Sequence, residues 1–452
     1  MVRTRFAPSP TGFLHIGGLR TAAYAYALAK HANGAFYLRI EDTDQKREVS
    51  GATEVIYRLL RQFGLHWDGE PVIQSTHAIA GVYHQAALQL VESGHAFYCQ
   101  CQARNAKADG YSTILRDPCR DRRLTSGAVK LRIPDGETIT YHDFILKKDI
   151  AWDSSKVSDT TLLKSDGQLP TYHLAMPVDD HSMGISHVLR AVEWLTSTPI
   201  HVLVYRYLGY DLPQIGHPSD ILDPGGGKLS KRKGNVSVDE FLQQGYLAES
   251  LLNYVILLGW APKDNRELFT LAEFVTAFDI SGFQKSNPAM NLQKLDWFNG
   301  HYLRQKSDTE LTQLVKPFVK NNISDTQITQ LLSLIKDRLV KLSDFDALTS
   351  FITTPPVYTV GLWAGLAAGD HLAFVKDRLF QVSSWTKETI EASLVDEVKS
   401  RGWKVGDFFM SLRIAICGSR STPPITDCLV ILGRDAALAR IQAAINYLGQ
   451  LG

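Results

Sequence analysis

The stretch that decides the fold runs from Arg3 to Arg20 and reads RTRFAPSPTGFLHIGGLR. Residues 4–7 predict a short strand, which ends at Pro8 because the prolines and glycine that follow cannot continue a β-ladder. The alanine-rich residues 19–30 predict a helix, and the alternating residues 35–40 predict a second strand. Together they predict a βαβ unit, with ligand-binding loops at the carboxyl ends of its strands.

The loop between this strand and helix has the composition of an anion site. Gly17 and Gly18 lie where the loop meets the helix N-terminus, and exposed N–H groups and the helix dipole attract anions there. His15 is placed to donate a hydrogen bond to a phosphoryl oxygen as charge builds at phosphorus. Taken alone, a loop histidine beside turn glycines is the simpler interpretation of His15. The acidic run that begins at Glu41 is expected to lie beside this loop and to complete one candidate site.

A second basic element lies far along the chain. Residues 223–227, DPGGG, are too glycine-rich for regular structure and lead directly into Lys228-Leu229-Ser230-Lys231-Arg232. Two lysines three residues apart on a loop can close over a triphosphate and neutralise the departing pyrophosphate. A solvated basic loop is the alternative.

PSPTGFLHIGG and KLSKR resemble the two signature motifs of class I aminoacyl-tRNA synthetases, HIGH and KMSKS. The flanking residues resemble the bacterial glutamyl branch, nearly end to end. Gly18 replaces the second histidine of HIGH, and KLSKR stands in place of KMSKS. Both departures are common in glutamyl enzymes. The resemblance assigns ATP binding to His15, Gly17, Gly18, Lys228, Leu229, Ser230 and Lys231, with His15, Lys228 and Lys231 as the catalytic residues.

The resemblance implies an α/β fold with a Rossmann-like catalytic domain, an inserted acceptor-binding subdomain and an all-α C-terminal anticodon-binding domain. The change of character between residues 74 and 171 agrees with an insertion, and helices are expected to dominate after residue 237. The expected boundaries are 1–75 and 172–222 for the two catalytic halves, 76–171 for the insertion, 223–306 for the KMSKS-type loop and stem-contact domain, and 307–452 for the anticodon-binding domain.

By the same resemblance, Arg5, Ala7, Ser9, Glu41, Tyr172 and Arg190 bind glutamate. Arg5 would face the side-chain carboxylate, since a planar guanidinium can hold a carboxylate with two parallel hydrogen bonds and so prefer glutamate to glutamine. Glu41 would meet the α-amino group. A surface arginine and a solvated acid are the alternatives for these two residues.

Three cysteines cluster in the expected insertion. Cys99, Cys101 and Cys119 resemble a zinc motif of some glutamyl enzymes, with Asp121 in the position of the fourth ligand and Tyr111 as another donor. Buried thiols without a metal are the alternative. Asp179, Asp180 and His181 are interpreted as structural residues, with no magnesium ligand among them.

The expected anticodon-binding domain carries its own candidate residues. By resemblance Arg413, Thr422 and Pro423 lie near the anticodon, and Arg338 matches an arginine that contacts the first anticodon base. Arginine reads unstacked bases by hydrogen bonding and stacking.

Composition limits the alternatives. A net charge of +1 on 452 residues excludes a globally basic RNA-binding protein, so an RNA surface must be a patch. Five cysteines, an odd number, favour a reducing compartment over a disulfide framework. No apolar run approaches the length of a membrane span, so a cytoplasmic protein with no membrane contact is expected. The expected form is a monomer.

The expected activity is a two-step ligation of L-glutamate to tRNA(Glu), with ATP and magnesium. Charging of tRNA(Gln) instead, or of both tRNAs, stays open. A glutamyl-queuosine tRNA(Asp) synthetase and a small nucleotidyltransferase share the HIGH-type loop, but neither accounts for the helical segment after residue 306. A synthetase that has lost catalysis is disfavoured because Arg5, His15, Lys228 and Lys231 are present.

Overall fold

The structure is a computed structural model that describes residues 1–101, 115–165, 169–227, 237–320 and 323–451. The chain forms two compact units. The first contains residues 1–243 and 248–295, and the second contains residues 244–247 and 296–452.

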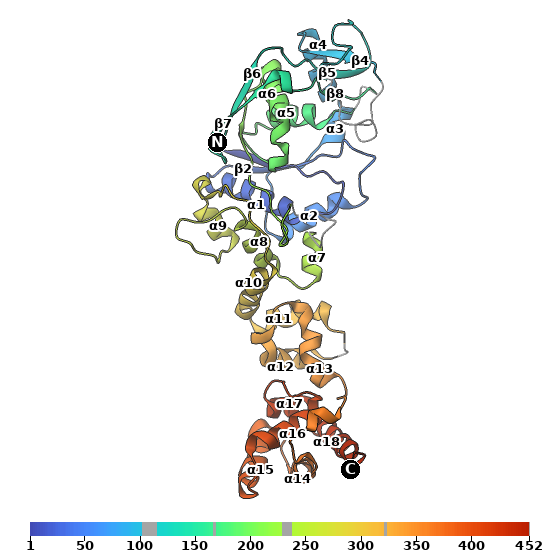
Figure 1. The fold of residues 1–452 in the computed structure, drawn as a ribbon, viewed down its shortest axis with the longest axis vertical. Coiled ribbons are helices and arrows are strands. Elements are labelled where there is room, and N and C mark those ends of the chain that lie inside the picture. The colour runs from blue at the N-terminus through green and yellow to red at the C-terminus, as the bar shows by residue number, and fades with distance from the viewer. Residues whose placement is uncertain (102–114, 166–168, 228–236, 321–322, 452) are drawn as a thin grey trace. The chain divides into compact units, whose positions relative to one another are not determined.

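The first unit opens with the expected βαβ arrangement (Figure 1). β1 (Arg3–Phe6), α1 (Ile16–His31) and β2 (Ala35–Ile40) follow in order, and β3 (Val72–Ile73) continues a parallel sheet in the order β1-β2-β3. The βαβ prediction is therefore confirmed. α1 begins three residues earlier than expected and takes the two glycines into its first turn, because the side chain of His15 caps it.

A second sheet has the order β7-β6-β10-β9. Its strands are β6 (Thr138–Asp143), β7 (Lys148–Asp153), β9 (His187–Leu189) and β10 (Gln214–Gly216). β10 is parallel to β6 and β9, and β6 pairs antiparallel with β7. The amide of Ser186 donates to the carbonyl of Arg3 at 2.9 Å, so β9 begins beside β1. The residues that follow β1 and β9 therefore come together at one site.

A third sheet is antiparallel, with the order β4-β5-β8. Its strands are β4 (Ala96–Cys99), β5 (Ala128–Leu131) and β8 (Thr161–Leu163). Leu131 and Leu162 are fully buried and belong to a core shared with α4. The finer domain boundaries within this unit stay predictions.

Helices complete the first unit. They are α2 (Ala52–Gln62), α3 (Gln74–Ile79), α4 (Val82–Glu92), α5 (Tyr172–Ser182), α6 (Thr198–Leu208), α7 (Val238–Gln243), α8 (Ala248–Ile256) and α9 (Leu271–Ala277), with 3-10 turns at Ser154–Lys156, Val192–Ser197 and Ile280–Gly282. The alanines of α1 let it pack closely between the sheet and α8. Tyr24 on α1 fixes this contact, since its hydroxyl donates to the carbonyls of Ile256 and Leu258 at 2.9 and 3.0 Å.

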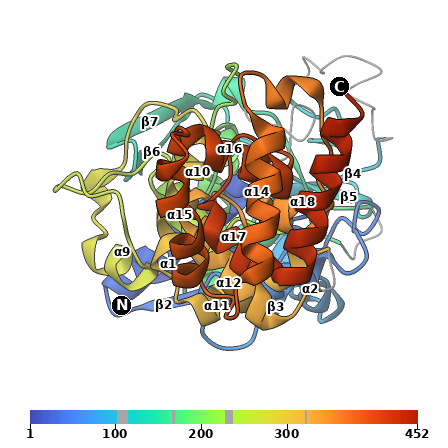
Figure 2. The ribbon, with the colours of Figure 1, turned by 90° about the horizontal axis from the view of Figure 1, so that it is seen from below.

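The second unit is helical throughout its described residues, as expected (Figure 1). It comprises α10 (Leu292–Gln305) from residue 296 on, α11 (Asp308–Val315), α12 (Asp325–Ile335), α13 (Phe345–Thr353), α14 (Ala368–Gln381), α15 (Lys387–Ser400), α16 (Val405–Cys417), α17 (Ile425–Leu432) and α18 (Arg434–Gly449), with 3-10 turns at Lys316–Phe318, Lys336–Arg338, Leu342–Asp344 and Val360–Trp363. Figure 2 shows α14, α16 and α18 side by side. Ala437, Ile441 and Ala444 form the fully buried stripe of α18, at the spacing that one helix face requires.

None of the helices in the described ranges is both long enough and apolar enough to cross a membrane.

Candidate active site

A cavity of about 530 Å³ lies at the junction of β1, β2 and β9, within the size range of ligand pockets. The loop from β1 to α1, the end of β2, the start of α5 and the segments after β9 and β10 all contribute to its wall. The sequence-predicted residues that line it are Arg5, Ala7, Ser9, His15, Gly17, Gly18, Glu41, Tyr172 and Arg190. Lys228, Leu229, Ser230 and Lys231 lie outside the described residues.

His15 is the N-cap residue of α1, and its hydrogen bond fixes its tautomer. Nδ1 accepts from the amide of Gly18 at 3.1 Å. An accepting Nδ1 leaves the ring proton on Nε2, so Nε2–H is a hydrogen-bond donor at the cavity wall. Capping and the predicted contact with a phosphoryl oxygen are thus compatible roles for the two ring nitrogens.

A Cβ at either glycine would crowd a neighbouring side chain. A Cβ on Gly17 would come within 3.1 Å of the His15 ring, and one on Gly18 would lie 2.8 Å from Leu14 Cδ1. The amides of Ile16 and Gly17 come too early in α1 to reach an intrahelical acceptor. This end of α1 therefore has the dipole and the uncommitted amides of an anion site.

Arg5 is anchored by a carboxylate. Its side chain is 3% exposed, Nε donates to Asp180 Oδ1 at 3.0 Å, and Nη1 donates to the carbonyl of Leu189 at 3.3 Å. Burial alone would raise the pKa of Asp180, but the neighbouring Arg39 and Arg5 hold it below its usual value. The charge of Arg5 is thus matched within the protein.

Arg39, which the sequence did not single out, holds Glu41. Its guanidinium is fully buried and donates to Glu41 Oε1 through Nη2 at 3.0 Å and Nε at 3.3 Å. Nη1 donates to Asp180, so one arginine organises both carboxylates. Burial raises the pKa of Glu41 above its usual value, although Arg39 and Arg5 oppose this shift. Glu41 is 9% exposed, at the edge of the cavity.

Asp179 lies beside this cluster, 3.8 Å from Arg39 Nε, and polar side chains hold its carboxylate. Its carboxylate accepts from Gln74 at 2.8 Å and from the Tyr83 hydroxyl at 2.9 and 3.0 Å, and His77 Nδ1 lies 2.9 Å away. The hydrogen bond to Asp179 raises the pKa of His77. Asp179 is fully buried and does not reach the cavity.

Arg190 lies directly after β9 and is 5% exposed, yet its partners are all uncharged groups. Nε donates to His217 Nε2 at 3.1 Å, and Nη2 donates to Thr198 Oγ1 at 2.8 Å. Nη1 donates to His201 Nδ1 at 2.8 Å and to the Tyr172 hydroxyl at 3.3 Å. Sequence reasoning missed both histidines, because they come from α6 and from the residue after β10.

Arg20 ties α1 to the far wall of the cavity. Its Nη1 donates to the carbonyl of Leu258 at 2.7 Å, and Nη2 donates to the carbonyl of Ser219. Asp220 and Ile221, the next two residues, line the cavity. Arg20 therefore fixes the segment that leads toward residue 228 against the helix that carries the glycines.

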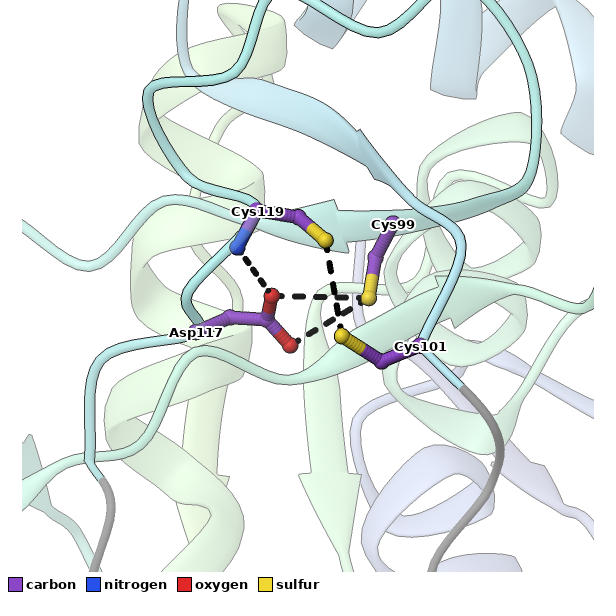
Figure 3. Close-up of side chains that lie close together, drawn as sticks. All are labelled: Cys99, Cys101, Asp117 and Cys119. Carbon is purple, nitrogen blue, oxygen red and sulfur yellow. Dashed lines mark hydrogen bonds between the residues drawn. The ribbon is translucent and has the colours of Figure 1, made fainter.

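Three cysteines lie close together with a carboxylate as the fourth member of the cluster (Figure 3). Cys99, Cys101, Asp117 and Cys119 each offer a ligand atom, and these atoms lie within 4.8 Å of one another. The sulfurs of Cys101 and Cys119 are 3.4 Å apart, and Cys99 Sγ lies 3.3 Å from Asp117 Oδ2. Burial raises the pKa of the Cys99 thiol to about 12, so a metal would have to displace a proton there.

The expectation that Asp121 is the fourth ligand is wrong. Asp121 is 83% exposed and pairs with Arg132 at 3.0 Å, whereas Asp117 is 7% exposed and faces the sulfurs. The physical reason is a turn: Asp117 Oδ1 accepts from the amide of Cys119 at 2.8 Å, which directs the carboxylate inward. Tyr111, the other donor considered, lies outside the described residues.

The four residues fit a zinc ion. Three thiolates and one carboxylate are ligands that zinc accepts, and four is its preferred coordination number. Lys130 Nζ lies 2.6 Å from Asp117 Oδ2, which offsets part of the negative charge that such a ligand set carries. Cys417 and Cys428 lie in the second unit and are buried.

The predicted anticodon residues divide by exposure. Arg338 ends a 3-10 turn and is exposed, as a base-reading side chain must be. Arg413 on α16 donates to the carbonyl of Thr422 at 2.9 Å, and the side chains of Thr422 and Pro423 are buried. Their roles in RNA recognition stay predictions.

Two family models match the chain. Residues 1–297 match "tRNA synthetases class I (E and Q), catalytic domain", and residues 310–445 match "Anticodon binding domain". A glutamate–tRNA ligase from Nitratidesulfovibrio vulgaris is 37% identical over 98% of this chain and 99% of its own length. A glutamate–tRNA ligase from Dehalococcoides mccartyi is also 37% identical, over 100% of this chain and 99% of its own length.

Solved structures agree. A glutamate tRNA ligase from Elizabethkingia meningosepticum, crystallised with its amino acid, superposes with a TM-score of 0.88 at 29% identity, over 99% of both chains. The glutamate-tRNA synthetase of Elizabethkingia anophelis also gives 0.88, at 30% identity over 98% and 99%. These matches confirm the expected fold class and activity. The chain therefore belongs to the class I glutamyl-tRNA synthetases, the family of glutamate–tRNA ligases.

Proposed function

We propose that this protein activates L-glutamate with ATP in the cavity at the start of α1 and transfers the glutamyl group to the 3′ end of tRNA(Glu). In the first step the α-carboxylate of glutamate attacks the α-phosphorus of ATP, which gives glutamyl adenylate and releases pyrophosphate. In the second step a ribose hydroxyl at the 3′ end of the tRNA takes the glutamyl group. The observation that carries the proposal is one cavity lined by His15, Arg5, Glu41 and Arg190.

The amino acid would occupy the inner part of this cavity. Glu41 offers an anionic partner for the α-amino group, and Arg5 and Arg190 offer guanidinium groups to the side-chain carboxylate. Tyr172 completes the wall, and its hydroxyl accepts from Arg190. Ala7 and Ser9 would contact the amino acid from the loop after β1.

The nucleotide would lie along the loop and the first turn of α1. His15 Nε2–H and the uncommitted amides of α1 would stabilise charge on the phosphates. Lys228 and Lys231 would close over the triphosphate from their own loop, with Leu229 and Ser230 between them. Magnesium, bound with the ATP, would neutralise phosphate charge and help to polarise the phosphoryl oxygens.

We also propose that Cys99, Cys101, Asp117 and Cys119 bind one structural zinc ion. Metal analysis of the purified protein should find about one zinc per chain, and Asp117→Asn should lower this content while Asp121→Asn should not. Cys428→Ser, outside the cluster, controls for the number of thiols. A metal-free wild-type protein would remove the zinc proposal and leave the catalytic one intact.

The tRNA would be read at two places. Residues 76–171 would hold its acceptor end, and the helical unit would bind the anticodon through the exposed Arg338, with Arg413, Thr422 and Pro423 shaping the surface nearby. All five cysteines are free thiols, which suits the reducing cytoplasm where we expect the protein to work.

The experiment is a charging assay with radiolabelled glutamate or glutamine and separate tRNA(Glu) and tRNA(Gln) transcripts. We expect glutamylation of tRNA(Glu) and no use of glutamine. Charging of tRNA(Gln) as well would assign a non-discriminating enzyme, and Arg338→Gln should then change the ratio of the two tRNAs. Failure to glutamylate either transcript would contradict the proposal.

The role of the second basic loop needs its own variant. Lys231→Ala should slow adenylate formation by about 10²-fold or more while tRNA affinity stays within about twofold, because a phosphate clamp acts on ATP alone. Lys285→Ala, another exposed lysine, is the matched control. An equal loss of ATP use and of tRNA affinity would refute this role.

A further inference from the structure

The two arginines of the cavity differ in how their charge is matched. Arg5 donates to the buried carboxylate of Asp180, so the protein itself supplies a negative charge beside it. Arg190 is nearly as buried, but within the described ranges no carboxylate lies within ion-pair distance of its guanidinium. Burying an arginine without a counter-ion costs free energy, so the absence of a partner carboxylate at Arg190 calls for an explanation.

The hydrogen bonds around Arg190 determine the protonation of its neighbours. A guanidinium can only donate, so both ring nitrogens that face it must be unprotonated acceptors. For His217 the acceptor is Nε2, which leaves the proton on Nδ1, 2.6 Å from Asp143 Oδ2. For His201 the acceptor is Nδ1, which leaves the proton on Nε2, 3.2 Å from His173 Nδ1.

The ring charges agree with this pattern. Burial, and then the charge of Arg190, hold the pKa of His201 well below its usual value. Burial and Arg190 lower the pKa of His173 to about 4. Burial also lowers the pKa of His217, although Asp143 opposes the shift. All three rings are therefore neutral at pH 7.

The donor count differs as well. An arginine has five N–H donors, and four of those on Arg190 are used by His217, Tyr172, His201 and Thr198. The guanidinium is thus held in place on the cavity wall, and one Nη2 donor is not engaged by a described residue. Arg5 has only two of its five donors engaged by described residues.

We propose that His201 and His217 are positioning residues whose neutral acceptor nitrogens lock Arg190 while leaving its charge unmatched, so that Arg190 selects an acidic over an amide side chain. Arg5 then contributes hydrogen bonds, and Arg190 contributes net positive charge. The side-chain carboxylate of glutamate supplies the missing counter-ion, and the amide of glutamine cannot. This inference rests on the proposed placement of glutamate against Arg190.

The test is a matched pair of variants in the full-length chain, His201→Asn and His201→Asp. Asn and Asp both place an acceptor oxygen near the position of Nδ1, and they differ in charge. Aminoacylation of a tRNA(Glu) transcript gives KM for glutamate and for ATP, and added glutamine gives its inhibition constant.

We expect the KM for glutamate to be at least about tenfold higher in His201→Asp than in His201→Asn, because the new carboxylate takes the place of the substrate as counter-ion. The KM for ATP should stay within about twofold, and the preference for glutamate over glutamine should fall about tenfold. Equal glutamate KM values in the two variants would overturn the inference.

Thr198→Asn and Thr198→Asp form a second pair with the same expectation. Position 198 is the first residue of α6, where the helix dipole tolerates a carboxylate, so this pair is decisive if thermal unfolding shows that His201→Asp does not fold. Arg190→Gln tests the proposed glutamate site separately from the role of the histidines. If it leaves the glutamate KM unchanged, the proposed glutamate site itself is wrong.

Discussion

The Arg5 side and the Arg190 side of the cavity differ in how their buried charges are matched. On the Arg5 side, two guanidinium groups share the carboxylates of Glu41, Asp179 and Asp180, so carboxylates are in excess. On the Arg190 side, one guanidinium is held by neutral rings and hydroxyls. In the proposed binding mode, the α-amino group of glutamate meets the side with excess carboxylates, and its side-chain carboxylate meets Arg190.

The difference teaches that a buried charge has two uses. A matched charge, like that of Arg39, holds Glu41, the proposed partner of the α-amino group, in position. An unmatched charge, like that of Arg190, can take the carboxylate of a ligand as its counter-ion. Removing the first kind should mainly cost stability, and removing the second kind should mainly cost glutamate binding.

Arg39→Met should produce the largest effect on stability. It leaves three buried or nearly buried carboxylates without their shared cation, and breaking such a cluster costs about 3–5 kcal/mol. Urea denaturation measures the free energy of unfolding, and Arg39→Lys, which keeps the charge, should recover part of the loss. A decrease in the free energy of unfolding of less than about 1 kcal/mol would contradict a structural role for the charge of Arg39.

Arg190→Gln should produce the largest effect on catalysis. We expect kcat/KM for glutamate to fall about 10²- to 10³-fold, because the counter-ion of the substrate carboxylate is removed from a buried site. Its neighbours are neutral, so the free energy of unfolding should fall by only about 1–3 kcal/mol. A stability loss as large as that of Arg39→Met would show that Arg190 is also a structural charge.

Acid should lower the stability contributed by the Arg190 side and by the Arg5 side of the cavity in different pH ranges. The unfolded chain protonates histidine near pH 6.5, whereas the folded chain holds the pKa of His173 at about 4 and keeps His201 and His217 lowered as well. Between these values the unfolded state binds more protons, so stability should fall as pH decreases, by up to about 1.4 kcal/mol per pH unit for each ring. Asp180, whose pKa is lowered, stabilises the fold above pH 4 and loses this contribution only below it.

Urea midpoints measured from pH 7.5 to 4 check this order. His173→Asn should reduce the slope by about one proton. A wild-type midpoint that stays constant down to pH 4.5 would contradict the neutral-histidine account.

Tyr172→Phe should produce the smallest effect. It removes one hydrogen bond to Arg190, at 3.3 Å, and leaves the two histidines in place. The KM for glutamate should rise about three- to fivefold, with kcat and the thermal midpoint nearly unchanged. A loss above about 50-fold would mean that Tyr172, rather than the histidines, positions Arg190.

The parts of this protein that depend on local sequence were predictable. Prolines and an alanine-rich run located β1 and α1. The residues predicted to bind glutamate, Arg5, Glu41 and Arg190, line one cavity because parallel strands end at the same edge. The start of α1 was misplaced by three residues, because glycines indicate a loop unless a cap such as His15 is taken into account.

The parts that depend on tertiary contacts were not predictable. His173, His201 and His217 come from separate segments, so nothing in their local sequence shows that they lie together. His201 and His217 contact Arg190, and His173 contacts His201. The aspartate of the cysteine cluster was misassigned because Asp117 and Asp121 both lie two residues from Cys119, and the turn geometry decides between them.

The most direct test of the central claim is a crystal structure of the wild-type protein with L-glutamate. We expect the side-chain carboxylate within hydrogen-bond distance of Arg190 Nη2, the α-amino group at Glu41, and His201 and His217 still bonded to Arg190. A protein carboxylate paired with Arg190, or a glutamate whose side chain points away from it, would show that Arg190 is not the counter-ion of the substrate.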